Sequence, residues 1–152
     1  EEAINIVCSR KSVRTYSNIP LSTSEMNTIL KVAKSGPVSG GLDCLNVDIL
    51  TTDSEKQCFY KACYYQEFVK NAAAIFVISS KDGIISNAYN QEYVQRFECE
   101  NATIAAHNII IASTFMGLST CFIGAIRQDI ITKVTKPDSS TAWCAVCVGK
   151  EK

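Results

Sequence analysis

The chain has 152 residues, with 15 basic and 15 acidic side chains and therefore no net charge, and 47% of its residues are hydrophobic. This length predicts one domain over residues 1–152 that buries about 68–70% of its unfolded surface, so its core needs no disulfide or metal. A chain without a broad basic field lacks the attraction that non-specific nucleic-acid binding requires. We therefore expect no nucleic-acid partner, and any bound phosphate is expected on a small molecule.

The cellular compartment is predicted from the same composition. No apolar run reaches the roughly 18 residues of a transmembrane helix, and Glu1 and Glu2 are acidic where a signal peptide would be basic. We expect a cytoplasmic protein that does not contact membranes. Disulfide frameworks belong to small secreted domains without a core, so the cysteines are expected to be reduced. There are eight of them: Cys8, Cys44, Cys58, Cys63, Cys99, Cys121, Cys144 and Cys147.

The opening segment has the composition of an anion site. Arg10, Lys11 and Arg14 place three cations within five residues, and Ser12 adds a hydroxyl. A guanidinium matches a phosphate with two parallel hydrogen bonds, and a serine can donate one more. A solvated charged face is the commoner explanation for such a cluster, so this segment alone does not establish a ligand.

The first half of the chain predicts two helices and two strands. Ser22 and Glu25 form a capping-box pattern, which predicts a helix that ends before Gly36-Pro37, and residues 37–41 are expected to be a flexible loop. Residues 46–51 alternate as a strand with one face in the core. Residues 54–70 are predicted to be one helix rich in aromatic residues, and residues 73–78 a strand buried on both faces.

The second half is dominated by one long helical pattern. Residues 87–116 are predicted to form a helix whose second half crosses the interior, with Gly117-Leu118 as its C-cap. Residues 120–126 are expected to be a short strand or tight turn, residues 128–136 a small helix and residues 142–148 a final strand.

Four other features have competing interpretations. Trp143, Cys144 and Cys147 match a redox-active Trp-Cys-x-x-Cys motif, but a strand there would point the two sulfurs to opposite faces. A zinc site needs a second ligand pair, and Cys58 with Cys63 is a poor one, so no metal is expected. His107 is interpreted as a core histidine rather than a catalytic base.

The tyrosines of the 54–70 segment are the fourth such feature. Their helical spacing favours a position in the core, and the alternative is that they are lid residues over a substrate. These residues are Tyr60, Tyr64 and Tyr65.

Three segments, in order, resemble motifs of the nitroreductase family of FMN-dependent oxidoreductases. Residues 10–14, Arg-Lys-Ser-Val-Arg, are similar to the family's Arg-x-Ser-x-Arg motif. Residues 35–42, Ser-Gly-Pro-Val-Ser-Gly-Gly-Leu, resemble the Ala-Pro-Ser-Ala-Gly-Gly-Leu loop of one branch. Residues 105–125 resemble the family's core helix and the Gly-Leu-Gly-Thr-x-x-Ile-Gly turn that follows it.

The resemblance implies an α+β fold, with a mixed sheet flanked by helices and a long buried central helix, and a homodimer with FMN at each of two subunit-interface sites. A dimer interface would also cover so apolar a helix. By the family's pattern Arg10 and Ser12 hold the FMN phosphate and ribityl chain, with Lys11 in the same segment. Arg14 has a catalytic role near the pyrimidine edge of the flavin. The other implied cofactor-binding residues are Pro37, Val38, Ser39, Gly40 and Gly41, from the partner subunit, and Ile123 and Gly124, which face N5.

The implied chemistry is hydride transfer from NADH or NADPH to the flavin, and from the flavin to a nitroaromatic, quinone or similar acceptor. Two alternatives stay open at this point. One is a domain that binds FMN without catalysing turnover, and the other is a thiol redox protein that uses its cysteines. A protein whose flavin is reduced by a nicotinamide would exclude both.

Overall fold

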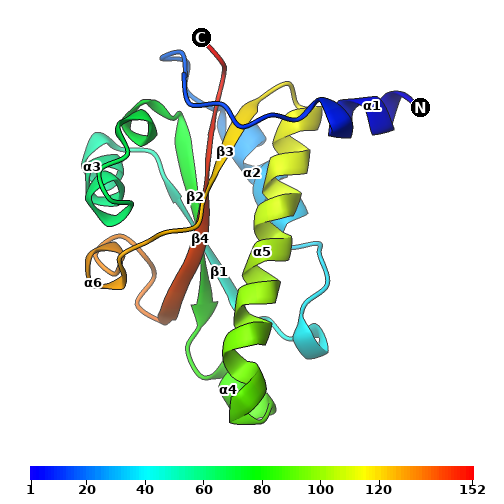
Figure 1. The fold of residues 1–152 in the computed structure, drawn as a ribbon, viewed down its shortest axis with the longest axis vertical. Coiled ribbons are helices and arrows are strands. Elements are labelled where there is room, and N and C mark those ends of the chain that lie inside the picture. Colours follow the sequence, from blue (N-terminus) through cyan, green and yellow to red (C-terminus); the bar gives the residue numbers. More distant parts are fainter.

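Four strands form one sheet in the order β1-β2-β4-β3, and all neighbouring strands are antiparallel (Figure 1). The computed structural model describes all residues, 1–152. The strands are β1 (Leu45–Leu50), β2 (Ala74–Lys81), β3 (Ser119–Ile123) and β4 (Ser139–Gly149). The helices are α1 (Glu2–Ser9), α2 (Thr23–Ala33), α3 (Asp53–Ala62), α4 (Ile84–Ala88), α5 (Gln91–Phe115) and α6 (Gln128–Ile131), and two 3-10 turns are η1 (Ser39–Gly41) and η2 (Glu67–Asn71).

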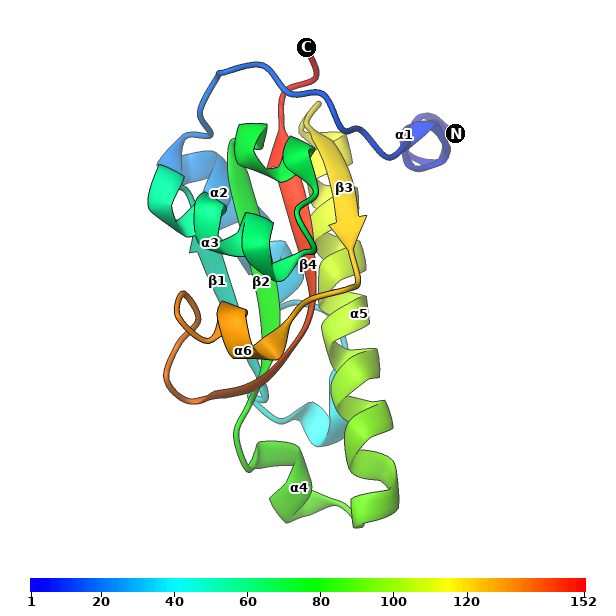
Figure 2. The ribbon, with the colours of Figure 1, turned by 60° about the vertical axis from the view of Figure 1, so that its left-hand side comes forward.

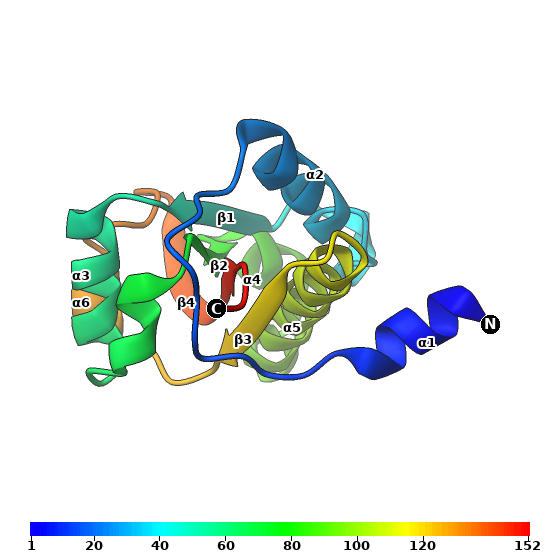
Figure 3. The ribbon, with the colours of Figure 1, turned by 90° about the horizontal axis from the view of Figure 1, so that it is seen from above.

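Helices cover both faces of the sheet. Seen from above, α2 and α5 lie on one side, while α3 and α6 lie on the other (Figure 3). Strand β2 is buried along nearly its whole length because its alternate side chains enter two different cores. Phe76 and Ile78 pack with the α2 and α5 side chains, and Ile75 and Val77 pack with those of α3 and α6. The predicted α+β fold class is confirmed, but the sheet is antiparallel rather than mixed, because every neighbouring pair of its four strands runs in opposite directions. The only parallel pairing is an isolated bridge between Ser12 and Thr120.

Several predicted elements have the expected ends. Ser22 and Glu25 form both hydrogen bonds of a capping box at the start of α2. At the end of α5 the amide of Gly117 donates to Thr114 O and that of Leu118 donates to Ser113 O, with Gly117 at φ 71°. These two bonds form a Schellman motif, which confirms the predicted C-cap. The short segment before α6 is a strand, β3, rather than a tight turn.

Three predictions about the elements need correction. The aromatic helix predicted over 54–70 ends at Ala62, because Tyr64 and Tyr65 have left-handed backbone conformations that no helix contains. The pattern over 87–116 is two helices, since Tyr89 and Asn90 are extended and separate α4 from α5. Strand β1 buries both faces rather than one, because Val47 enters the α2–α5 core and Leu50 the opposite one.

The N-terminal helix α1 was not predicted, and it projects from the body of the molecule (Figure 3). None of its residues is buried, and Ile4 and Val7 are exposed. No helix combines the length and apolar character that crossing a bilayer requires.

Candidate functional site

The Arg10–Arg14 segment lies along the free edge of the sheet. Ser12 forms its parallel bridge to Thr120 of β3, and the amide of Val13 donates to Thr120 O over 2.9 Å. Val13 is buried, and Tyr16 donates its hydroxyl to Val13 O over 2.7 Å from within the same core. Because successive side chains of an extended segment point to opposite sides, burial of Val13 leaves Ser12 and Arg14 facing solvent.

A small polar cavity of about 200 Å³ opens where this segment meets the end of α5. Its donors are the guanidinium of Arg10, the ammonium of Lys11 and several hydroxyls. Gly117 borders it, and a side chain there would meet open space. The full lining is Ser9, Arg10, Lys11, Val13, Thr114, Gly117, Leu118, Ser119 and Thr120. Two cations among hydroxyls and backbone amides suit an anion such as a phosphate.

The two cations of this cavity differ in availability. Lys11 Nζ lies 2.9 Å from Glu151 Oε1 in an exposed ion pair. The same C-terminal stretch pairs with the segment after Arg14, since Ser17 N donates to Lys150 O and Lys152 N donates to Thr15 O. Arg10 is exposed and forms no ion pair. An anion in the cavity therefore meets Arg10 directly but must compete with Glu151 for Lys11.

Arg14 lies farther along the same edge of the sheet. Its guanidinium carbon is 5.8 Å from the centre of the Phe68 ring, which belongs to η2. Burial raises the pKa of the Cys121 thiol in β3, and the positive charge of Arg14 partly opposes the rise. Arg14 thus places an exposed positive charge between β3 and η2.

The same edge continues to Ile123 and Gly124. Ile123 is buried and pairs with Ala145 of β4, whereas Gly124 is exposed just beyond the strand. A Cβ on Gly124 would come 3.3 Å from the Phe122 ring, so this position favours a small residue. Strand β3 therefore brings two of the three predicted motifs onto one edge, with Arg10 near its start and Gly124 at its end.

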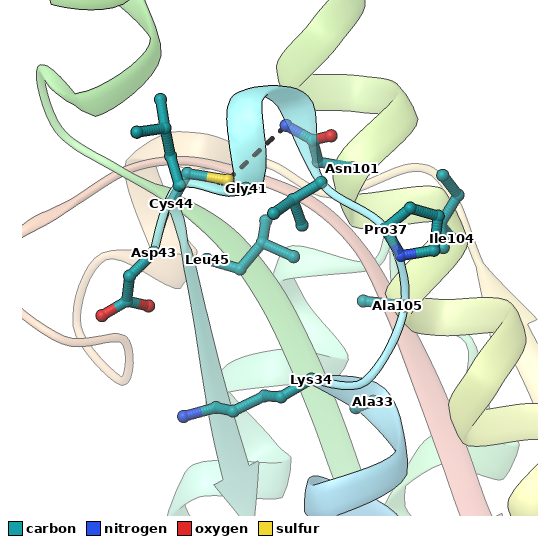
Figure 4. Close-up of a pocket in the computed structure, with 13 residues that line it drawn as sticks. Ala33, Lys34, Pro37, Gly41, Asp43, Cys44, Leu45, Asn101, Ile104 and Ala105 are labelled. Atoms are coloured by element: carbon teal, nitrogen blue, oxygen red, sulfur yellow. Dashed lines mark hydrogen bonds between the residues drawn. The ribbon is translucent and has the colours of Figure 1, made fainter.

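The third predicted segment, Pro37–Gly41, is an ordered turn rather than a flexible loop. Asn101 of α5 accepts hydrogen bonds from the amide and hydroxyl of Ser39, at 3.0 and 3.1 Å, and donates to Cys44 Sγ (Figure 4). Gly40 and Gly41 have φ values of 61° and 64°, which glycine adopts without steric cost. At Gly40 a Cβ would lie 2.7 Å from the Tyr89 hydroxyl, so Tyr89 closes this side of the turn.

This turn lines a different cavity from the one beside Arg10. The second cavity measures about 580 Å³, and Figure 4 shows it between the turn, the end of α2 and the middle of α5. Pro37, Val38 and Gly41 belong to its lining, together with Ile104 and Ala105 of α5. The two cavities share no residue, and their α5 residues are about ten positions or 15 Å apart along the helix. One copy of the chain thus keeps the turn apart from the Arg10–Arg14 segment.

Asn101 is the site residue that sequence reasoning missed. It is 3% exposed in a helix whose other buried residues are mostly apolar. A polar side chain within the apolar stripe of a predicted helix was an available signal, because a buried amide requires partners.

Two of the competing interpretations were wrong. His107 is exposed, because the buried face of α5 is formed by residues such as Ala106 and Ile110 and His107 points away from it. Tyr64 and Tyr65 are also exposed, at 61% and 57%, because α3 ends before them.

The geometry of the Trp-Cys-x-x-Cys segment agrees with the prediction of opposite faces. Cys144 lies in the core beside α5, and Cys147 lies in the core beside α3. Burial raises the pKa of Cys144 to about 12 and that of Cys147 well above its usual value. All eight cysteines are free, and these two thiols cannot form a disulfide across the sheet.

Comparison with known proteins gives one family. Residues 52–150 match the sequence model of the Nitroreductase family. An FMN reductase (NADPH) of Bacillus subtilis is 23% identical over 160 residues, which cover 96% of this chain and 64% of the relative. The chain therefore spans less than two thirds of that relative.

Solved structures agree with the family match. The nitroreductase NfrA1 of Bacillus subtilis superimposes with a TM-score of 0.87 at 23% identity, over 98% of this chain and 66% of that one. A nitroreductase family protein of Clostridium novyi gives 0.87 at 18% identity, over 100% and 86%. These similarities show the fold, and the family match covers more than half of the chain. The chain thus belongs to the nitroreductase family, the FMN-dependent NAD(P)H oxidoreductases that its motifs resemble.

Proposed function

We propose that this protein binds FMN and uses NADH or NADPH to reduce nitroaromatic, quinone or similar acceptors. The observation that carries the proposal is the edge of β3, which brings together Arg10, Arg14 and Gly124, three of the residues predicted to bind the flavin. Family membership and the names of relatives, among them an FMN reductase (NADPH) and an NADPH-flavin oxidoreductase of Vibrio harveyi, support the same chemistry.

The residues at this edge fit FMN. The phosphate would be held at the 200 Å³ cavity, where Arg10 is free to bind it. Ser9 and Thr120 also line the cavity, and the Ser9 hydroxyl donates to Ile6 O. Ser12 faces solvent next to this cavity and would bind the ribityl chain. No acidic residue lines the cavity, so only the nearby Glu151 would repel a bound anion. Binding of the anion would displace Glu151 from its ion pair with Lys11.

We propose a homodimer as the complete form of the site. The turn Pro37–Gly41 is held away from the Arg10–Arg14 segment of its own chain, so the turn of a second copy would cover the flavin. The outward face of α5 supports this arrangement, because Ile104 and Phe115 are 36% and 49% exposed there. Apolar side chains in a row on a central helix are typical of a surface that a partner covers.

The residues of this chain have defined tasks in the reaction. FMN, when bound, would supply the hydride chemistry between the nicotinamide and the acceptor. Arg14 would place a permanent positive charge beside the flavin, where it would favour negative charge. Gly124 is exposed and has no side chain at this end of the sheet edge, which suits the approach of a planar ring. The protein thus orients the reactants and excludes water rather than transferring protons.

The test is the visible spectrum of the protein after reconstitution with FMN and gel filtration. We expect flavin absorption to elute with the protein, and we expect the colour to bleach when NADH or NADPH is added without oxygen. Retained flavin that neither nicotinamide bleaches would contradict the enzymatic role and favour a binding domain. A colourless protein would contradict the proposal as a whole.

Arg10→Ala tests the phosphate site directly. Loss of charge-assisted hydrogen bonds worth roughly 1.5–3 kcal/mol should weaken FMN binding at least about tenfold, measured by titration of flavin fluorescence. Arg96→Ala is the matched control, since Arg96 is exposed near the start of α5 and lines none of the described cavities. Equal FMN affinity in the Arg10 variant and the control would refute this assignment.

A further inference from the structure

The segment between α3 and η2 contains two consecutive tyrosines in an unusual backbone conformation. Tyr64 and Tyr65 have φ values of 59° and 62°, and they are the only residues other than glycine with positive φ. In this region the Cβ of an L-residue crowds the backbone, which is why glycine is the common residue there. Non-glycine residues held in this conformation concentrate at functional sites. We call residues 63–66 the tyrosine turn.

Both rings of the tyrosine turn face solvent. Tyr64 is 61% exposed and Tyr65 57% exposed, so neither ring serves the core. Single exposed aromatic residues are ordinary. Two neighbouring rings on a sterically disfavoured turn are not explained by packing.

The turn is nevertheless held in place. The Tyr65 amide donates to Tyr60 O over 2.8 Å, and the Tyr65 ring meets the Tyr60 ring edge to face at 5.3 Å. Tyr60 is fixed in turn, because its hydroxyl donates to Glu67 and Lys70 Nζ lies 4.4 Å from the centre of its ring. Rings positioned before a ligand arrives lose little freedom on binding.

The location of the turn connects it to the candidate site. In Figures 2 and 3 the chain after α3 lies between that helix and the strand β3 with the N-terminal segment beside it. Contacts on both sides of the turn agree with this view: Arg127 N donates to Ala62 O over 2.9 Å, and the Phe68 ring lies under Arg14. The tyrosine turn is therefore bracketed by contacts to Arg14 and to the segment that follows Gly124.

We propose that Tyr64 and Tyr65 are specificity-determining residues that bind planar aromatic acceptors by stacking beside the flavin site. This inference rests on the proposed function and names residues for its acceptor. Aromatic rings attract one another in offset or edge-to-face geometry beyond the burial of their area. The strained backbone keeps the two rings at the surface, where an acceptor can reach them.

The test compares two double variants of the reconstituted enzyme. Tyr64→Gly with Tyr65→Gly suits the left-handed backbone and removes both rings, and Tyr64→Phe with Tyr65→Phe keeps the rings. The probe is 4-nitrobenzoate, whose Kd is measured from the change in the flavin spectrum without turnover. We expect the glycine variant to raise this Kd about tenfold and the phenylalanine variant to stay within about twofold of the original protein.

Kinetics separate acceptor binding from the other steps. In the glycine variant KM for menadione should rise, whereas the rate with ferricyanide, which has no ring to stack, and the Kd of FMN should be unchanged. An unchanged Kd for 4-nitrobenzoate in a glycine variant that holds FMN normally would overturn the inference and leave the proposed function intact. If the glycine variant bound FMN correspondingly more weakly, the rings would belong to the cofactor site, and the inference would also be overturned. If the unsubstituted protein bound no FMN, both the proposed function and this inference would be refuted.

Discussion

Asn101 controls the conformation of the Pro37–Gly41 turn through a single buried side chain. Its carbonyl oxygen is the acceptor for two donors of Ser39, and its amide donates to Cys44. No other residue bonds the Ser39 amide or hydroxyl. The shape of the turn that is proposed to cover the flavin of a partner subunit therefore depends on a residue 62 positions away in sequence.

Asn101→Ala should destabilise the protein by about 1–3 kcal/mol, because the Ser39 donors lose their partner in a part-buried site. It should also weaken FMN binding, because the turn loses its anchor. Urea unfolding and flavin titration measure the two effects. The control is Thr103→Ala, which removes an exposed side chain of the same helix whose only bond is to its own backbone turn. Equal stability of both variants would show that Asn101 does not hold the turn.

The side chain of Glu98 is buried, which disfavours the charged form of its carboxyl group. Burial raises its pKa, the Ser80 hydroxyl partly opposes this by hydrogen bonding, and Asp82 raises it further. Because the folded form has the higher pKa, the folded protein binds more protons than the unfolded one between the two values. The free energy of unfolding therefore falls as the pH rises between these two pKa values. Above them, the charged and buried Glu98 continues to destabilise the folded protein.

Glu98→Gln should raise Tm at pH 8 and have little effect at pH 4, where the carboxyl of Glu98 is protonated in the folded protein. Glutamine keeps an acceptor for Ser80, whose hydroxyl oxygen also accepts from Trp143 Nε1 over 2.8 Å. Thermal unfolding of both proteins across this range measures the difference. A gain in Tm that is the same at both pH values would rule out ionisation as its cause.

At the scale of the element, the end of α5 shows how one glycine connects a helix to the candidate site. Gly117 reverses the chain in the Schellman motif, so that β3 starts beside the Arg10 cavity. A Cβ at this position would meet no atom within 4 Å. Its glycine is thus required by the backbone conformation alone, at φ 71°.

Gly117→Ala should cost about 1–2 kcal/mol, the price of a left-handed alanine without any clash. Gly117→Asn should cost less, because asparagine tolerates this conformation. Chemical denaturation gives both values. A cost for asparagine equal to or above that for alanine would point to a steric rather than a conformational origin.

At the scale of the whole molecule, α5 separates two surfaces. One side of the helix packs in the core against the sheet. The other side carries two exposed apolar residues, Ile104 and Phe115, with the half-buried Ile111 between them at helical spacing. The helix α1 projects near the C-terminal end of α5, and none of its residues is buried (Figure 1). Both features fit the proposed dimer, in which a second copy covers them.

Phe115→Lys should shift the protein from dimer to monomer and lower FMN affinity together. The substitution adds a cation near the C-terminus of α5, where the helix dipole favours it, so the helix itself should remain stable. Light scattering after gel filtration measures the mass. Lys133→Glu alters an exposed charge after α6, on the opposite side of the sheet, and is expected to leave the mass unchanged. A dimeric Phe115 variant would contradict the proposed interface.

Local patterns predicted much of the fold. The capping box at Ser22 and the glycine end of α5 depend on interactions between residues near one another in sequence, and the strand through Phe76 is marked by a continuous apolar run. The order of three motifs was enough to indicate the family. The same reasoning failed at Tyr64, where aromatic residues at helical spacing continue past the real end of α3.

The sequence by itself determined the family, the types of the main elements and the cations of the Arg10–Arg14 segment, because those depend on residue chemistry and short-range spacing. Only the tertiary structure decided that this segment lies beside β3 and that Lys11 forms an ion pair with Glu151. It also decided that Asn101 fixes the distant turn and that His107 faces outward. Each of these depends on contacts between residues far apart in the chain, or on which side of a helix packs against the sheet. Periodicity shows that a helix has an apolar side, but the packing of other elements sets where that side ends.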